Sequence, residues 1–214
     1  MRAPVFGLVG GIGSGKSVVA DCWAELGCEV SHSDELVRLA LEDPVVKARL
    51  IGWWGPRIVS PEGTIDRKAV AAIVFQDPAE RRRLESITHP WIEERRRAAF
   101  AGASNAPAYV IDAPLLLEVG LDKECDAVVF VDASRSLREA RVASSRGWGP
   151  EELARREAAQ LPLDQKRARA DYVLRNEGDL ASLRSEARRL LERMLATHAA
   201  QQRGDTSAPA PRHG

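Results

Sequence analysis

The chain has 214 residues, a length that suits one domain with room for an insertion and that can bury a substantial core. Its 31 Lys and Arg balance its 31 Asp and Glu, so it lacks the basic excess that favours nucleic acid or an anionic membrane surface. The three cysteines (Cys22, Cys28 and Cys125) match no zinc-binding spacing, and their number is odd. They therefore predict reduced packing thiols rather than a metal site or a disulfide framework.

A short apolar run over residues 5–9 predicts a buried strand, and helical spacing over residues 18–26 predicts a helix. Between them, residues 10–17 read Gly-Gly-Ile-Gly-Ser-Gly-Lys-Ser, which fits the phosphate-loop pattern G-x-x-x-x-G-K-[ST]. Glycines let the backbone point its N–H groups at an anion, and the helix N-terminus adds its positive dipole end. The segment predicts a nucleoside triphosphate site formed by Gly11, Ile12, Gly13, Ser14, Gly15, Lys16, Ser17 and Val18.

Within that loop, two side chains have assigned chemistry. Lys16 can reach the β- and γ-phosphates, and the Ser17 hydroxyl can hold Mg²⁺.

The early position of the loop leaves no room for a signal peptide before it, and no apolar run approaches membrane-spanning length. The sequence therefore favours a cytoplasmic protein.

Residues 28–31 predict a second short strand that leads into His32, Ser33 and Asp34. Ligands of open α/β sheets bind at the carboxyl ends of strands, so Asp34 is a candidate general base. The alternative is that Asp34 only caps a helix over residues 35–41. Position in the sequence does not separate the two interpretations.

Residues 35–103 predict helices rather than strands, and the segment is much longer than a usual crossover. Asp43, Asp66 and Asp77 each have the position of a helix cap, and Thr88-His89-Pro90 predicts the start of a further helix over 91–101. We interpret this region as a helical insertion that forms a second binding surface. Its two arginine triplets, 81–83 and 95–97, lie among glutamates and favour solvated helix faces, with contact to an anionic substrate as the alternative.

Residues 109–112 predict a third strand, and Asp112 ends it, where a Walker B aspartate supports Mg²⁺. A purely apolar fourth strand follows over 127–131. Two helices, 136–146 and 151–159, then flank a break at 147–150. Because the first of them carries arginines, residues 136–170 can be a lid that closes over phosphates, or an ordinary amphipathic pair.

Residues 171–174 predict a fifth strand, and Asp179 caps a last helix that reaches about His198. Residues 201–214 hold almost no large apolar side chain and predict a disordered tail. Five strands interleaved with helices predict an α/β fold of the P-loop NTPase type, with three layers and a five-stranded parallel sheet. Its nucleotide-binding core comprises residues 1–34, 104–135 and 171–200.

Several further segments, in order and at compatible spacing, narrow the family. They are 7–17, 33–38, 62–67 with Val74-Phe75, 84–90, 114–118, Gln160, Lys166, Ala170-Asp171 and 176–178. Over residues 5 to about 195 the chain resembles the dephospho-coenzyme A kinase family. One departure is His32, where that family often has Asp.

The resemblance implies transfer of the γ-phosphoryl group of ATP, with Mg²⁺, to the ribose 3′-hydroxyl of dephospho-CoA. It implies catalytic roles for Lys16, Asp34 and Arg141, and Mg²⁺ binding by Ser17 with Asp112 acting through water. Arg141, Arg146 and Asn176 join the loop in binding ATP. The residues implied on the acceptor side are Asp34, Arg38, His89, Leu115 and Glu118. Two alternatives remain open. Arg38 can instead form a salt bridge with Glu35 or Glu42, and His89 can instead hydrogen-bond the backbone at a helix start.

Other functions remain as alternatives. Another small-molecule kinase, acting on a nucleoside or nucleoside monophosphate, shares the loop and lid but not segments 62–67 and 88–90. A GTPase is disfavoured because residues 176–179 (Asn-Glu-Gly-Asp) lack the Lys of the guanine-reading pattern. A non-catalytic nucleotide-binding regulator could lose Asp34, Arg141 and Arg146, and all three are present. The sequence implies no obligate protein partner.

Overall fold

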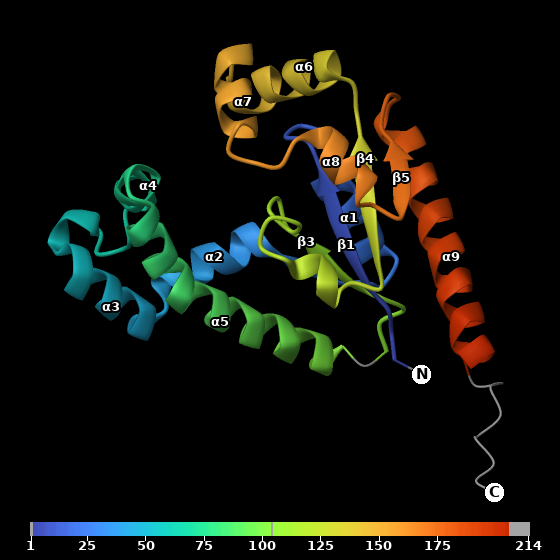
Figure 1. Cartoon of the computed structure of the whole chain (residues 1–214), viewed down its shortest axis with the longest axis horizontal. Coiled ribbons are helices and arrows are strands. Elements are labelled where there is room, and N and C mark those ends of the chain that lie inside the picture. The colour runs from blue at the N-terminus through green and yellow to red at the C-terminus, as the bar shows by residue number, and fades with distance from the viewer. Residues whose placement is uncertain (1, 104, 206–214) are drawn as a thin grey trace, which may run out of the picture. The chain divides into compact units, whose positions relative to one another are not determined.

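Figure 1 shows the computed structural model, which describes residues 2–103 and 105–205. The chain forms two compact units. We call Met1–Ser31 with Ala103–Gly214 the core unit and His32–Gly102 the helical unit, and each is described by itself.

The core unit is built on a five-stranded sheet with the order β2-β3-β1-β4-β5. The strands are β1 (Val5–Gly10), β2 (Glu29–His32), β3 (Tyr109–Asp112), β4 (Ala127–Asp132) and β5 (Tyr172–Arg175). β1 pairs in parallel with β3 and β4, and β4 pairs in parallel with β5. The predicted parallel α/β fold is therefore confirmed, with the glycine-rich loop leaving the middle strand.

Helices cover both faces of this sheet (Figure 1). These covering helices are α1 (Lys16–Glu25) and α9 (Leu180–Asp205) on one face and α8 (Leu163–Ala168) on the other, with a 3₁₀ turn η2 (Leu121–Glu124). The helices α6 (Arg135–Arg146) and α7 (Pro150–Glu157) lie beyond the ends of the strands (Figure 1). α1 and α9 pack together over one face, where Trp23 is fully buried and its Nε1 donates to the Ala187 carbonyl at 2.9 Å. On the other face, Leu116 and Cys125 lie directly against Gly7, and α8 contacts β1.

Two cysteines belong to the core beneath α1 and α9. Cys22 and Cys28 are free thiols, buried among apolar side chains, as the sequence predicts. Burial raises the pKa of the Cys28 thiol to about 11, because the thiolate would lose its hydration.

The C-terminal helix is longer than predicted. α9 continues to Asp205, past His198, so the prediction of disorder is wrong for residues 201–205. The Gln202 side chain reaches back to the Arg2 carbonyl at 3.3 Å, a contact that a polar composition does not reveal. The rest of the predicted tail, 206–214, lies outside the described residues.

The helical unit holds α2 (Ser33–Glu42), α3 (Pro44–Trp54), α4 (Arg67–Gln76) and α5 (Pro78–Gly102), with a 3₁₀ turn η1 (Pro56–Ile58). Two predicted caps are confirmed: Asp43 accepts hydrogen bonds from the first-turn amides of α3, and Asp66 from those of α4. The unit has its own apolar core, which includes Leu50, Trp54 and Ile58.

The predicted helix start at residues 88–90 is wrong, because α5 runs without a break through Pro90. Proline removes one backbone donor from a helix interior and usually breaks or kinks it. Here Ile87 and Trp91, one turn apart on either side of Pro90, both pack against the core of the helical unit. Tertiary packing on both sides of the proline therefore outweighs its local cost.

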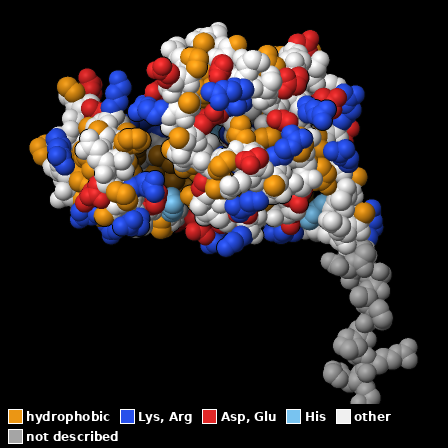
Figure 2. Space-filling view, turned by 45° about the horizontal axis from the view of Figure 1, so that its top comes forward, with side chains coloured by type: hydrophobic (Ala, Val, Ile, Leu, Met, Phe, Trp, Pro, Cys, Tyr) orange, Lys and Arg blue, Asp and Glu red, His pale blue; other side chains and the backbone are white. Residues whose placement is uncertain are grey.

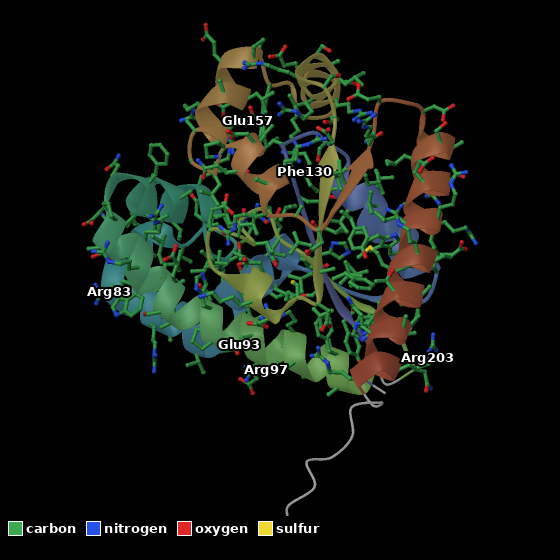
Figure 3. The ribbon with its side chains drawn as sticks, turned by 45° about the vertical axis from the view of Figure 1, so that its right-hand side comes forward. Arg83, Glu93, Arg97, Phe130, Glu157 and Arg203 are labelled. Carbon is green, nitrogen blue, oxygen red and sulfur yellow. The ribbon has the colours of Figure 1, made fainter. Side chains whose placement is uncertain are left out.

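The arginine triplets on α5 are not wholly solvated. Arg96 is 3% exposed, so the prediction of a solvated face is wrong for it. Arg83 and Arg95 stack over the rings of Trp53 and Trp91, at 4.2 and 4.8 Å from the ring centroids. Arg97 pairs with Glu93 one turn earlier, as Figure 3 shows on α5.

Surface charge is mixed, as the zero net charge suggests. On the face that Figure 2 shows, Lys and Arg side chains lie among Asp and Glu. Across residues 2–103 and 105–205, no helix combines the length and apolar character needed to cross a membrane.

Candidate active site

The glycine-rich loop joins the end of β1 to the first residue of α1. Ser14 N donates to the Gly11 carbonyl at 3.1 Å, which closes a tight turn, and α1 begins at Lys16. Gly15 precedes the helix with a φ of 93°, a left-handed conformation that favours glycine. The loop therefore meets the open N-terminal turn of α1, which is the arrangement that binds phosphate.

Lys16 and Asp112 form an ion pair beside this loop. Lys16 Nζ lies 2.6 Å from Asp112 Oδ1, and both side chains are largely buried, at 12% and 8% exposure. The pairing follows from the sheet: Asp112 ends β3 opposite Leu8 of β1, two residues before the loop begins at Gly10. Parallel neighbours thus bring the predicted cation and the predicted carboxylate to one edge of the sheet, while Ser17 remains exposed.

Asn176, the residue after β5, fastens the loop from the opposite end of the chain. Its Nδ2 donates to the Ser14 carbonyl at 2.7 Å, and its own backbone N donates to the Asp132 carbonyl at 2.7 Å. A Cβ on Gly15 would lie 2.3 Å from this amide nitrogen. Asn176 thus supports the loop, and its own contact with ATP stays a prediction.

Arg141 reaches the loop through Asn176, whereas Arg146 does not. One terminal nitrogen of Arg141 donates to both the backbone and side-chain oxygens of Asn176, each at 3.2 Å. Its other terminal nitrogen is buried and has no hydrogen-bond partner among the described residues. Arg146 is exposed and lies over the Trp148 ring at 4.8 Å, so its contact with ATP stays a prediction.

Arg138 is one of the arginines on the predicted lid helix, but it was not among the predicted site residues, and the structure buries it at this site. Only 5% of it is exposed, and its side chain lies against Gly11 and Ile12 of the loop. The one available signal was helical spacing: Arg138, Arg141 and Val142 occur at i, i+3 and i+4, and all three face inward from α6.

Glu118 takes part in a buried network behind β3. Lys166 is fully buried, and its Nζ contacts Glu118 Oε1 at 3.0 Å, the Pro114 carbonyl at 3.0 Å and Gln160 Oε1 at 2.9 Å. Glu118 Oε1 also accepts a hydrogen bond from Leu161 N. This network fastens the segment after β3 to the segment between α7 and α8. The acceptor-binding roles of Glu118 and of Leu115, which is 42% exposed, stay predictions.

The remaining acceptor-side residues belong to the helical unit. Asp34 is exposed in the first turn of α2, which starts at Ser33 after His32, so the alternative that Asp34 caps this helix is wrong. The open alternative for Arg38 is present as a pair with Glu35 at 3.5 Å, with both side chains more than half exposed. His89 is exposed within α5, away from any helix start.

Comparisons with known proteins identify the family of this chain. The dephospho-CoA kinase family model matches residues 4–182. The chain is 43% identical over 190 residues to the dephospho-CoA kinase of Anaeromyxobacter dehalogenans (87% of this chain, 90% of that protein). It is 38% identical over 195 residues to that of Syntrophotalea carbinolica (89% and 92%).

A Thermus thermophilus crystal structure matches at 33% identity with a TM-score of 0.78, covering 94% of this chain and 98% of that one. The dephospho-CoA kinase structure from Campylobacter jejuni shares the fold at 21% identity and a TM-score of 0.66, with coverages of 91% and 98%. A family model that spans most of the chain and curated relatives near 40% identity agree. The chain belongs to the dephospho-CoA kinase family.

Proposed function

We propose that this protein transfers the γ-phosphoryl group of ATP to the ribose 3′-hydroxyl of dephospho-CoA, giving coenzyme A and ADP. Family membership makes it a kinase with ATP as a substrate. The observation that carries the proposal is the glycine-rich loop at the start of α1, with Lys16 paired to Asp112 beside it. The choice of acceptor rests on the family.

Phosphoryl transfer demands little covalent chemistry from the protein, because most of the catalysis is positioning and charge neutralisation. In our proposal the loop amides and Lys16 bind the β- and γ-phosphates. Arg141, whose second terminal nitrogen has no protein partner among the described residues, stabilises negative charge on the transferring group. Arg146 and the segment 136–170 then act as a lid over the phosphates.

The residues beside the loop suit Mg²⁺, a hard cation that prefers oxygen ligands and keeps several waters. Ser17 offers a hydroxyl and Asp112 a carboxylate at this edge of the sheet. These two residues would hold the ion, Asp112 through water, and the ion would neutralise charge on the β- and γ-phosphate oxygens.

On the acceptor side, we propose that Asp34 accepts or orients the proton of the 3′-hydroxyl. Arg38, His89, Leu115 and Glu118 bind the rest of the acceptor, with residues 35–103 as its binding region. The exposed Arg38–Glu35 pair supports this role, because such pairs contribute little and exchange readily for a substrate anion.

We also propose a cytoplasmic enzyme that needs neither nucleic acid, a membrane nor a protein partner. Support comes from the balanced charge of the chain and from its buried free thiols, which suit a reducing compartment.

The test is ADP release from Mg-ATP by the purified protein, measured with dephospho-CoA, AMP, adenosine or no acceptor. We expect a strong rate with dephospho-CoA alone, and mass spectrometry of the product should show one added phosphate. A faster rate with AMP or adenosine would replace the proposed acceptor. ATP binding without ADP release from any acceptor would favour a regulator instead.

A further inference from the structure

Arg138 lies directly against the backbone of the phosphate loop. A Cβ built on Gly11 would be 2.9 Å from one terminal nitrogen of Arg138 and 3.2 Å from its Cζ, so the guanidinium occupies the space beside that glycine. The same nitrogen lies 3.5 Å from the Ile12 carbonyl, and Arg138 Nε donates to the Ala133 carbonyl at 3.2 Å. The guanidinium is thus fixed between the loop and the end of β4.

This arginine carries a buried charge that is paired with a carboxylate. Its side chain is 6% exposed and pairs with Glu157, the last residue of α7, which Figure 3 labels. Burial matters because charges removed from solvent are screened much less than exposed ones. Whatever anion the loop binds will therefore experience the charge of Arg138, reduced by that of Glu157.

We propose that Arg138 is a positioning residue whose buried charge, set by Glu157, tunes the affinity of the loop for nucleotide phosphates. Arg138 does so from behind the loop backbone, through the Gly11–Ile12 segment. The inference rests on the proposed function in that it takes the loop as the ATP site.

The Arg138–Glu157 pair makes the proposal testable, because removing each partner should change the affinity for an anion in opposite directions. Removing the cation should weaken anion binding, whereas removing only the carboxylate should strengthen it. If Arg138 and Glu157 act merely as structural support, losing either one should loosen the loop and weaken binding. The two explanations therefore predict opposite results for one of the two variants.

The experiment is calorimetric titration of ADP into the full chain, without acceptor. We expect Arg138→Met, which keeps most of the side-chain length, to weaken ADP binding about tenfold. We expect Glu157→Gln, which keeps a hydrogen-bond acceptor, to tighten it by about the same factor. This is the size of effect that a unit charge produces over about 10 Å at an effective dielectric constant of about 20.

Arg138→Lys retains the charge and should stay close to the parent protein. The matched control is Glu139→Gln, which makes the same charge change on α6. Glu139 is paired there with the exposed Arg135, so ADP affinity should not change. Thermal unfolding of each variant establishes that it is folded before titration.

Weaker ADP binding by a folded Glu157→Gln variant would overturn the proposal. So would a Glu139→Gln control whose ADP affinity rises as much as that of Glu157→Gln. If Arg138→Met does not fold, the sign of the Glu157→Gln effect still decides. A parent protein that binds ADP but does not phosphorylate dephospho-CoA would refute the proposed reaction and leave this inference intact.

Discussion

Two residues predicted to bind ATP, Lys16 and Asn176, are held by buried partners in the core unit, whereas the predicted acceptor-side residues of the helical unit are exposed. Asn176 is 5% exposed and bonds the loop, and Lys16 is paired with Asp112. In contrast, Asp34 and His89 are exposed, and Arg38 has only a loose surface pair.

The two groups differ in when their side chains become ordered: the buried ones during folding, the exposed ones only when a ligand binds. Side chains ordered during folding cost no further conformational entropy when a ligand arrives, whereas exposed ones do. Substitutions on the nucleotide side should therefore cost stability as well as activity. Substitutions of the exposed acceptor-side residues on the helical unit should cost activity alone.

The largest effect should come from the acceptor side. We expect Asp34→Asn to lower turnover about 10²–10⁴-fold, the usual contribution of a positioned base. Because Asp34 is exposed, the free energy of unfolding should change by no more than about 0.5 kcal/mol. Steady-state kinetics and urea unfolding measure the two. Glu85→Gln, a carboxylate on α5 paired with Arg81, is the matched control, and near-normal turnover of Asp34→Asn would exclude a base role.

The buried network behind β3 should show the opposite pattern. Lys166→Met leaves Glu118 without its cation, and breaking a buried pair costs about 3–5 kcal/mol. Urea unfolding should show this loss. Adding Glu118→Leu should recover most of it, because the orphaned charge is then removed as well. A loss below about 1 kcal/mol would mean that the network does not hold this region together.

Lys16 should affect both turnover and the affinity for ADP. We expect Lys16→Met to lower turnover about 10²–10³-fold, as the loss of one preorganised donor to developing charge does. It should also weaken ADP binding in calorimetry. An unchanged ADP affinity would show that Lys16 acts only in the transition state.

The smallest effect concerns pH and reports on the core unit alone, since Cys22, Cys28 and Cys125 all belong to it. Burial raises the pKa of Cys28 to about 11, so above about pH 8.5 unfolded thiols ionise while this one stays protonated. The unfolded state then binds fewer protons, and the free energy of unfolding should fall as pH rises, by at most about 1.4 kcal/mol per pH unit.

Urea unfolding from pH 8 upward measures that slope. The Cys28→Ala variant should lose part of it, while the titration of other groups is common to both proteins. Equal slopes in the two proteins would place the raised pKa in doubt.

Local patterns in the sequence were enough to predict much of the fold and part of the candidate site. The strand, the glycines and the helix of residues 5–26 form one continuous segment, so neighbouring residues determine the loop. Asp112 was also predictable, because the carboxyl ends of parallel strands meet at one edge. Both predictions depend on order along the chain and on regular geometry.

The predictions that were wrong or missing concern positions that long-range packing decides. Thr88-His89-Pro90 indicates a helix start locally, but Ile87 and Trp91 pack in one core and keep α5 continuous. Arg138 carries no mark that distinguishes it from the other arginines of α6, and only the loop and α7 around it reveal its burial. Tertiary contacts decide such positions, and single-sequence patterns do not encode them.

The hydrogen bond from Asn176 to the Ser14 carbonyl has a consequence for protein synthesis. Its two residues are 162 positions apart, so the loop is held by a residue that is synthesised long after it. A ribosome must deliver the fifth strand before that clamp exists. The nascent chain therefore carries a nucleotide loop without this hydrogen bond until Asn176 has been synthesised and β5 has joined the sheet.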